Sequence, residues 1–186
     1  MKKSLVLMAA LALVLGVSSL ASAQALDSGA KTIALNATLN ESLTLNLSAS
    51  TVNFTLAAGS AANAGSANVT ATTKWVLKPG RSAVAVYAYF SSATAALSDS
   101  LGNNIPSSAF SIADNAGTAT ALTAITPYNA GASGLRLQNV AISSANRSSQ
   151  VTDNMAFNID LSGGSLPQLP AGTYTGTLNI QAQATP

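Results

Sequence analysis

The feature that most constrains the fold is a long alternating stretch near the start of the chain, residues 32–48. Its apolar side chains fall on odd positions and only Glu41 interrupts them: Ile33, Leu35, Ala37, Leu39, Leu43, Leu45 and Leu47. A period of two is the pattern of a β-strand with one apolar face. Strands in globular proteins usually run about 3 to 10 residues, so the stretch is too long for one strand. We therefore expect two strands that meet at residues 40–42, with apolar faces that can serve different partners. We assign Leu43, Leu45 and Leu47 to the core of the domain itself.

The segment before this stretch has the three parts of a secretory leader. Lys2 and Lys3 precede an apolar run at residues 5–15, and Ala21-Ser22-Ala23 supplies the small residues of a cleavage site. The alternative is an uncleaved anchor, but the apolar run is too short for a bilayer of about 30 Å. We expect residues 1–23 to be a signal peptide. The protein is then secreted through the periplasm to the cell surface or beyond, without membrane insertion after leader removal.

Removal of the leader leaves a chain with no formal net charge. The leader holds two of the eight basic residues and none of the six acidic ones. A nucleic-acid partner is therefore not expected, because it would be attracted by a basic surface. So low a charge also gives little repulsion between copies, which suits a protein that associates with itself.

The rest of the chain consists of short alternating stretches separated by turn-forming residues. No apolar pattern of helical period persists for three turns after the leader. The alternating stretches are residues 52–56, 69–77, 84–90, 110–112, 119–125, 135–142, 155–161 and 174–182. About eight strands with turns between them predict an all-β fold, an antiparallel immunoglobulin-like sandwich of two sheets. We place it at residues 42–186, after an N-terminal extension at residues 24–41.

The sharpest local prediction is a β-hairpin around Pro79-Gly80. Proline fixes φ and glycine accepts a positive φ, and alternating stretches lie on both sides of the pair. Pairing Leu77 with Ser82 would set Trp75 opposite Val84 and give one coherent apolar face. The opposite face would then be the outer one.

Residues that carry catalysis are scarce. The chain has no histidine and no cysteine, and Glu41 is its single glutamate. Because general acids and bases are nearly absent, we expect no enzyme, no catalytic residue and no cofactor.

Aspartate and asparagine at residues 99–104 and 153–154 offer oxygen ligands for calcium. Their spacing differs from that of a helix-loop-helix calcium loop, and such residues are common in turns, so we assign no metal site.

A candidate exposed aromatic face consists of Tyr87, Tyr89 and Tyr128. The first two lie on the predicted outer face of the hairpin and the third in a loop. Aromatic rings with one polar end suit partly wet binding surfaces. This supports an alternative function, a monomeric secreted adhesion or carbohydrate-binding module, in which residues 32–39 pair as the first strand of their own sheet.

The C-terminal segment Leu169-Pro-Ala-Gly-Thr-Tyr-Thr-Gly-Thr-Leu-Asn-Ile-Gln181 resembles the last strand of the spore coat U family and of the related archaic chaperone-usher pilins. These are secreted bacterial domains with an incomplete immunoglobulin-like sandwich. Residues 31–39 also lie where those pilins keep the strand that they donate to the next subunit. The chain lacks the cysteine pair and the C-terminal aromatic residue that such pilins often carry.

The resemblance implies a sandwich that lacks one strand and is completed by strand donation from another copy. The candidate intersubunit strand residues are Ile33, Leu35, Ala37 and Leu39. A head-to-tail contact of this kind propagates a fibre. The expected function is thus a structural subunit of a bacterial extracellular fibre, pilus or surface assembly. Its partners would be other copies or related subunits, and the resemblance also implies a periplasmic chaperone and usher.

Overall fold

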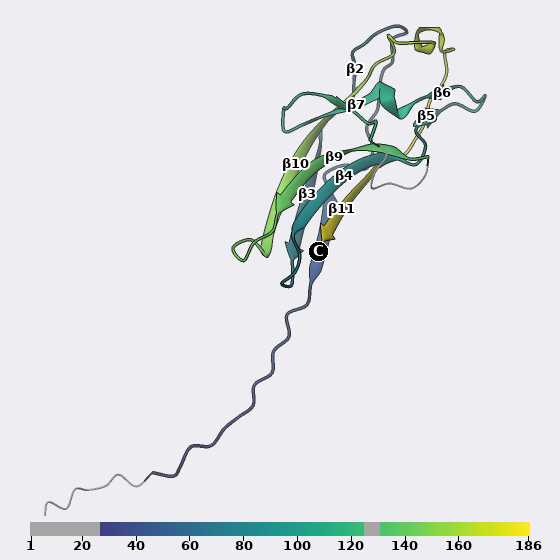
Figure 1. Ribbon diagram of the computed structural model, residues 1–186. Helices are drawn as coiled ribbons and strands as arrows, with labels where there is room; N and C mark the ends of the chain where they lie inside the picture. The colour runs from purple at the N-terminus through teal and green to yellow at the C-terminus, as the bar shows by residue number, and fades with distance from the viewer. Residues whose placement is uncertain (1–26, 125–130) are drawn as a thin grey trace, which may run out of the picture. The chain divides into compact units, whose positions relative to one another are not determined.

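The computed structural model describes residues 27–124 and 131–186, and it is nearly all β (Figure 1). The chain divides into two units, residues 1–38 and residues 39–186. In the first unit, residues 27–38 form no helix or strand and their side chains are exposed. The second unit is an antiparallel sandwich, which confirms the predicted fold class.

The larger sheet is built on β3 and β10, which pair along most of their length. Its strands, in order, are β1 (Ser42–Leu47), β3 (Val69–Val76), β10 (Ser148–Ile159), β7 (Phe110–Asp114) and β8 (Thr120–Ala121), and β2 (Asn63–Ala64) also pairs with β10. β1 begins at Ser42, inside the predicted junction, and lies antiparallel to β3 with Leu43 opposite Trp75. β1 is therefore an edge strand of this sheet.

The facing sheet is built on β4, whose two neighbours are both antiparallel to it. Its strands, in order, are β11 (Asn179–Thr185), β4 (Ala83–Phe90) and β9 (Ser133–Ala141). The register of β4 with β9 shifts between Val86, which lies opposite Gln138, and Tyr87, which lies opposite Arg136. The short strands β5 (Leu97–Ser98) and β6 (Asn104–Ile105) pair separately, and Ser107–Ala109 and Leu166–Gln168 are 3₁₀ turns.

The predicted hairpin around Pro79-Gly80 is wrong. β3 pairs with β1 and β10, whereas β4 pairs with β11 and β9, so the turn connects the two sheets. Trp75 and Val84 are both buried and belong to the same apolar cluster. Alternation turns the same side chains inward whether two strands are neighbours in one sheet or lie in facing sheets. The pattern therefore predicted the buried face correctly and the pairing wrongly.

Among the described residues the core has two apolar clusters. The larger contains Phe90, Phe110, Met155 and Phe157, and the smaller is built on Trp75. Both β3 and β10 pass from one cluster to the other at a buried polar residue. These residues are Thr73, between Ala71 and Trp75, and Asp153, between Val151 and Met155.

The two lateral sides of the sandwich differ. On one side, a bridge between Ala124 and Gly134 links the segment after β8 to β9. On the other side, the edge strands β1 and β11 lie next to each other, and no pairing joins them within the described residues. This second side is the open one.

The two ends of the sandwich also differ (Figure 1). The turn end carries the β3–β4 connection, the β9–β10 connection and the C-terminus, since the Leu77 N–H donates to the Arg147 carbonyl and the Ser82 N–H to that of Thr185. The loop end carries β2, β5 and β6.

The leucines of β1 lie along the direction from the turn end to the loop end. Leu43 and Leu45 pack against the core, as expected, but Leu47, expected there too, is 44% exposed because the chain leaves the sheet after it.

Candidate strand-acceptor groove

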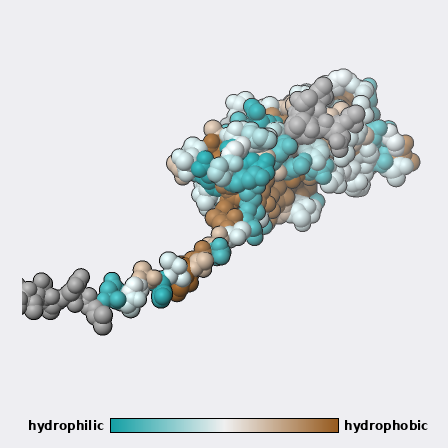
Figure 2. Space-filling view, turned by 60° about the horizontal axis from the view of Figure 1, so that its bottom comes forward, coloured by the Kyte–Doolittle hydropathy of each residue, from teal (hydrophilic) through white to brown (hydrophobic). Residues whose placement is uncertain are grey.

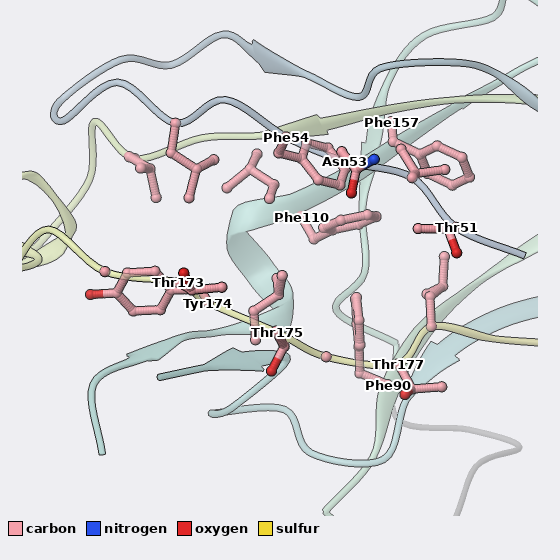
Figure 3. A pocket seen from close by; sticks show the side chains of 18 of the residues that line it. Thr51, Asn53, Phe54, Phe90, Phe110, Phe157, Thr173, Tyr174, Thr175 and Thr177 are labelled. Carbon is pink, nitrogen blue, oxygen red and sulfur yellow. The ribbon is translucent and has the colours of Figure 1, made fainter. Parts of the chain in front are cut away.

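Beyond the paired part of β1, the open side widens into a groove of about 850 Å³ (Figure 3). Its walls are residues 47–58 on one side and residues 169–180 on the other. Its floor consists of inward side chains from both sheets: Val69, Phe90, Phe110, Met155, Phe157 and Ile159. Phe110 makes edge-to-face ring contacts with Phe54 and Phe90, with centroids 5.7 and 5.1 Å apart. The floor of the groove is thus apolar.

The first wall is the alternating segment at residues 52–56, which was predicted to be a strand. Val52, Phe54 and Leu56 turn toward the core and are half-buried, as in a strand. Among residues 27–124 and 131–186, a single isolated bridge, from Phe54 to Gly65, pairs the segment. Within the described residues, the backbone N–H groups of Ser50, Val52 and Phe54 form no hydrogen bond. This wall therefore has an extended backbone and an unpaired edge.

The second wall is the segment before β11. The predicted strand at residues 174–182 is paired in its second half only, because β11 begins at Asn179. Thr175 exchanges two backbone hydrogen bonds of 2.9 Å with Ser98 of β5. In an extended chain successive residues point to opposite sides, so the neighbouring backbone groups point away from β5. In the described structure, the N–H groups of Tyr174, Gly176 and Leu178 form no hydrogen bond.

Glycine holds each wall close to its neighbour. A Cβ atom at Gly176 would lie 1.9 Å from the Ala96 carbonyl oxygen, and one at Gly65 would lie 2.7 Å from Val52 Cγ1. The Tyr174 hydroxyl donates to the Pro170 carbonyl at 2.9 Å and fixes the start of the second wall. Both walls are thus held in place without a strand between them.

The arrangement has what an added β-strand needs. Unpaired backbone groups line both walls, and an apolar floor separates them. Unpaired backbone groups are costly to leave without water or a partner, and an exposed sheet edge is a template for another strand. An extended peptide placed here would form main-chain hydrogen bonds on both sides and direct alternate side chains into the floor.

The candidate intersubunit strand lies in the segment that precedes β1. Ile33, Leu35 and Leu39 are 84%, 89% and 84% exposed, Ala37 is exposed as well, and residues 27–41 form no strand. Figure 2 shows hydrophobic residues along the described part of this segment. Large apolar side chains grouped in this way on a surface usually indicate an interaction site. Their alternation leaves every second side chain apolar, as an added strand requires.

Glu41, which interrupts the apolar row, anchors the base of this segment to the turn end. Its carboxylate accepts hydrogen bonds from the Arg81 Nε, 3.0 Å away, and from the Lys78 backbone N–H, 3.2 Å away, and the Lys78 Nζ lies 3.5 Å from it. The hydrogen bond from Arg81 holds the pKa of Glu41 at about 2. The alternating pattern around Glu41 did not predict this role. The available signal was one acidic residue in an apolar row and two basic residues in a turn.

The candidate aromatic face is only partly described. Tyr87 and Tyr89 are half-buried on the outer face of β4, opposite Gln181 and Asn179 of β11. Tyr128 lies outside the described residues. The structure thus places two of the three tyrosines on one sheet face.

The candidate calcium ligands do not come together. Asp99 stabilises its own turn: its carboxylate accepts hydrogen bonds from Leu101 and Asn103, and the Asn103 side chain contributes most to the lowered pKa of Asp99. Asp153 is buried in the core. Residues 27–124 and 131–186 contain no group of three aspartate or glutamate residues placed to hold a metal ion. The same residues contain no helix long and apolar enough to cross a membrane.

No protein-family model matches this sequence, and no curated protein is significantly similar to it. The groove and the exposed alternating segment are therefore the features that indicate a function.

Proposed function

We propose that this protein is a structural subunit of a bacterial extracellular fibre, pilus or surface assembly. In this proposal residues 31–40 of one copy form a β-strand in the groove of the next copy. One observation carries the proposal: a chain with an unfilled apolar groove between two unpaired backbone edges also carries an exposed alternating apolar segment.

The donor and the groove match in length. Ten extended residues, 31–40, span about 33 Å at about 3.3 Å per residue, which is close to the length of the twelve-residue walls, 47–58 and 169–180. Ile33, Leu35, Ala37 and Leu39 would point to the same side of the added strand. Full burial of each large apolar side chain would stabilise the contact by about 1.5 to 3 kcal/mol.

The position of the donor's base favours a head-to-tail contact over mutual exchange. Glu41 is bound to Arg81 at the turn end, whereas the groove begins at Leu47 and extends toward the loop end. The donor base and the acceptor therefore occupy different ends of the sandwich. A contact between two different surfaces of identical subunits repeats without closing, and it forms a filament unless the geometry makes a ring.

The alternative is a monomeric adhesion or carbohydrate-binding module. It requires residues 32–39 to pair in their own sheet, and residues 27–41 form no strand in the structure. Electron microscopy of the purified chain without its leader distinguishes the two functions. Strand addition predicts filaments and heat-resistant oligomer ladders, whereas the monomeric module predicts neither.

A truncated chain that begins at Ser42 tests the donor role directly. It should stay folded by circular dichroism, form no filaments and bind a synthetic peptide of residues 31–40. A control peptide with aspartate in place of Leu35 should not bind. Filaments from the truncated chain would contradict the proposal, because no donor segment would remain.

A further inference from the structure

We infer that the turn end and the loop end of the sandwich form a complementary charged interface between successive copies. This inference rests on the proposed strand addition and adds a second contact to it. The partner surface is the loop end of another copy of the same chain. The observation behind it is the uneven distribution of the few charged residues along the sandwich.

The turn end is basic. Lys78 and Arg81 lie in the β3–β4 connection, and the Lys78 side chain is 65% exposed. Arg147 lies beside them, since its carbonyl accepts the Leu77 N–H at 2.8 Å. Glu41 neutralises one of these three charges. The turn end therefore keeps a positive excess at neutral pH.

The loop end is acidic. Asp160 follows the last residue of β10 and is exposed, and its N–H donates to the Ala109 carbonyl at 2.8 Å. Asp99 lies in the β5–β6 turn next to Gly172 of the second groove wall. Burial and the charge of Asp99 raise the pKa of Tyr174 in the same wall. Hydrogen bonds within their own turns lower the pKa of Asp99 and of Asp160, so both carboxylates are charged at neutral pH.

Basic residues are missing from this end of the described sandwich. Those that the described sandwich has are Lys74, Lys78, Arg81, Arg136 and Arg147. Lys74 lies on β3 and Arg136 on β9, and the other three lie at the turn end. The described sandwich thus has no basic side chain at its loop end to neutralise this negative charge.

Strand addition brings these two ends together. A donor strand whose base is held at the turn end enters the neighbouring groove from the loop end, because at the other end of the groove β1 and β11 already lie next to each other. The base at Glu41 then lies near the outer end of the acceptor's walls, where Asp99 is found beside Gly172. Lys78 and Arg81 surround that base. Opposite charges therefore face each other where one copy meets the next.

Such a contact acts mainly on the rate and register of association. Exposed charge pairs add little affinity, but complementary fields steer the encounter, and salt weakens them. We expect elongation of filaments to slow when sodium chloride is raised from about 20 mM to about 500 mM. The apolar donor strand would still give stable filaments once formed.

A charge swap tests the interface in the full chain without its leader. Lys78→Glu replaces a positive charge at the turn end by a negative one. Asp160→Lys replaces a negative charge at the loop end by a positive one. Each single variant should elongate about tenfold more slowly at low salt, because like charges then face each other. The double variant restores an opposite pair at every contact and should elongate within about twofold of the unsubstituted chain. Arg136→Glu, a reversal midway along β9, is the matched control and should elongate at the unsubstituted rate.

The outcomes separate this inference from the proposed function. Equal rates for the single variants and the unsubstituted chain would overturn the charged interface and leave strand addition intact. A slow Lys78→Glu variant that Asp160→Lys does not restore would also overturn it, since the defect would then lie in the Glu41 anchor. Failure of the unsubstituted chain to form filaments or bind the peptide of residues 31–40 would overturn the proposed function itself.

Discussion

At the scale of single residues, Gly176 has the strictest requirement. Its backbone lies against the Ala96 carbonyl oxygen, and a Cβ would be 1.9 Å from that oxygen. We expect Gly176→Ala to lower the free energy of unfolding by about 2 to 4 kcal/mol, because backbone atoms must move to admit the methyl group. Urea denaturation measures this. Gly163→Ala is the control, since a Cβ atom at Gly163 would have no neighbour within 4 Å, and an equal loss in both variants would contradict the explanation.

Asp153 is the second residue with a measurable consequence. It is fully buried, its carboxylate has no hydrogen-bond partner within the described residues, and burial together with the charge of Asp114 raises its pKa from 3.8 to about 6. A raised pKa means that the folded state binds the proton more tightly than the unfolded state. The stabilising effect of this proton is complete below about pH 4 and is lost as the pH rises through about 6.

We therefore expect the free energy of unfolding to fall by about 2 kcal/mol between pH 4 and pH 7. Asp153→Asn should remove most of this fall, because an amide does not ionise. Denaturation at several pH values measures it, with Asp27→Asn, a substitution outside the sandwich, as the control. The same slope in Asp153→Asn and the unsubstituted chain would show that another group is responsible.

At the scale of elements, the two groove walls differ from the paired strands in their backbone hydrogen bonds. Amide hydrogens without a bond exchange quickly with solvent, and those in a stable sheet exchange slowly. In the chain truncated at Ser42, we expect Val52 and Gly176 to exchange fast and Thr72, in the middle of β3, to exchange slowly. Added peptide of residues 31–40 should protect Val52 and Gly176 and leave Thr72 unchanged. Hydrogen exchange read by NMR tests this, and walls that are already protected without peptide would contradict an open acceptor.

The same elements show what the sequence could predict. Alternation identified the inward residues of β3, β4 and β10, because a period of two depends only on which side is buried. It did not identify which strands pair, since the Pro79-Gly80 turn suits a hairpin and a connection between sheets equally well. It also predicted strands at residues 52–56 and 174–178, where the structure has extended walls with the right side-chain directions and no neighbour along most of their length.

Of the two parts of the candidate site, the sequence allowed a prediction for the N-terminal apolar segment and none for the groove. The candidate donor residues were predicted from alternation in a segment before the first strand, which is a local signal. The acceptor groove depends on Phe90, Phe110 and Phe157, which are far apart in the sequence and meet only in the folded sandwich. The anchor at Glu41 depends on Arg81, 40 residues away. Long-range contacts of this kind leave no periodic pattern.

At the scale of the whole molecule, the proposal requires that one face of the donor segment decides assembly. Leu35 and Asn36 are consecutive residues and point to opposite sides of an added strand. Leu35→Asp would direct a charge into the apolar floor, where an unpaired carboxylate is strongly disfavoured, so we expect filaments to be lost. Asn36→Asp introduces the same charge on the side that faces solvent, and it should assemble as the unsubstituted chain does.

This pair of variants also separates strand addition from unspecific apolar association. The sandwich at residues 42–186 is unchanged in both variants, so both should accept an unsubstituted peptide of residues 31–40, while only Asn36→Asp should supply a working donor. In a mixture, Leu35→Asp chains should end growing filaments, because each can accept a donor and cannot provide one. Sedimentation and electron microscopy of such mixtures should show shorter filaments as their fraction rises. Equal assembly of the two variants would mean that the alternating face is not the contact, whereas loss in both would mean that net charge controls association.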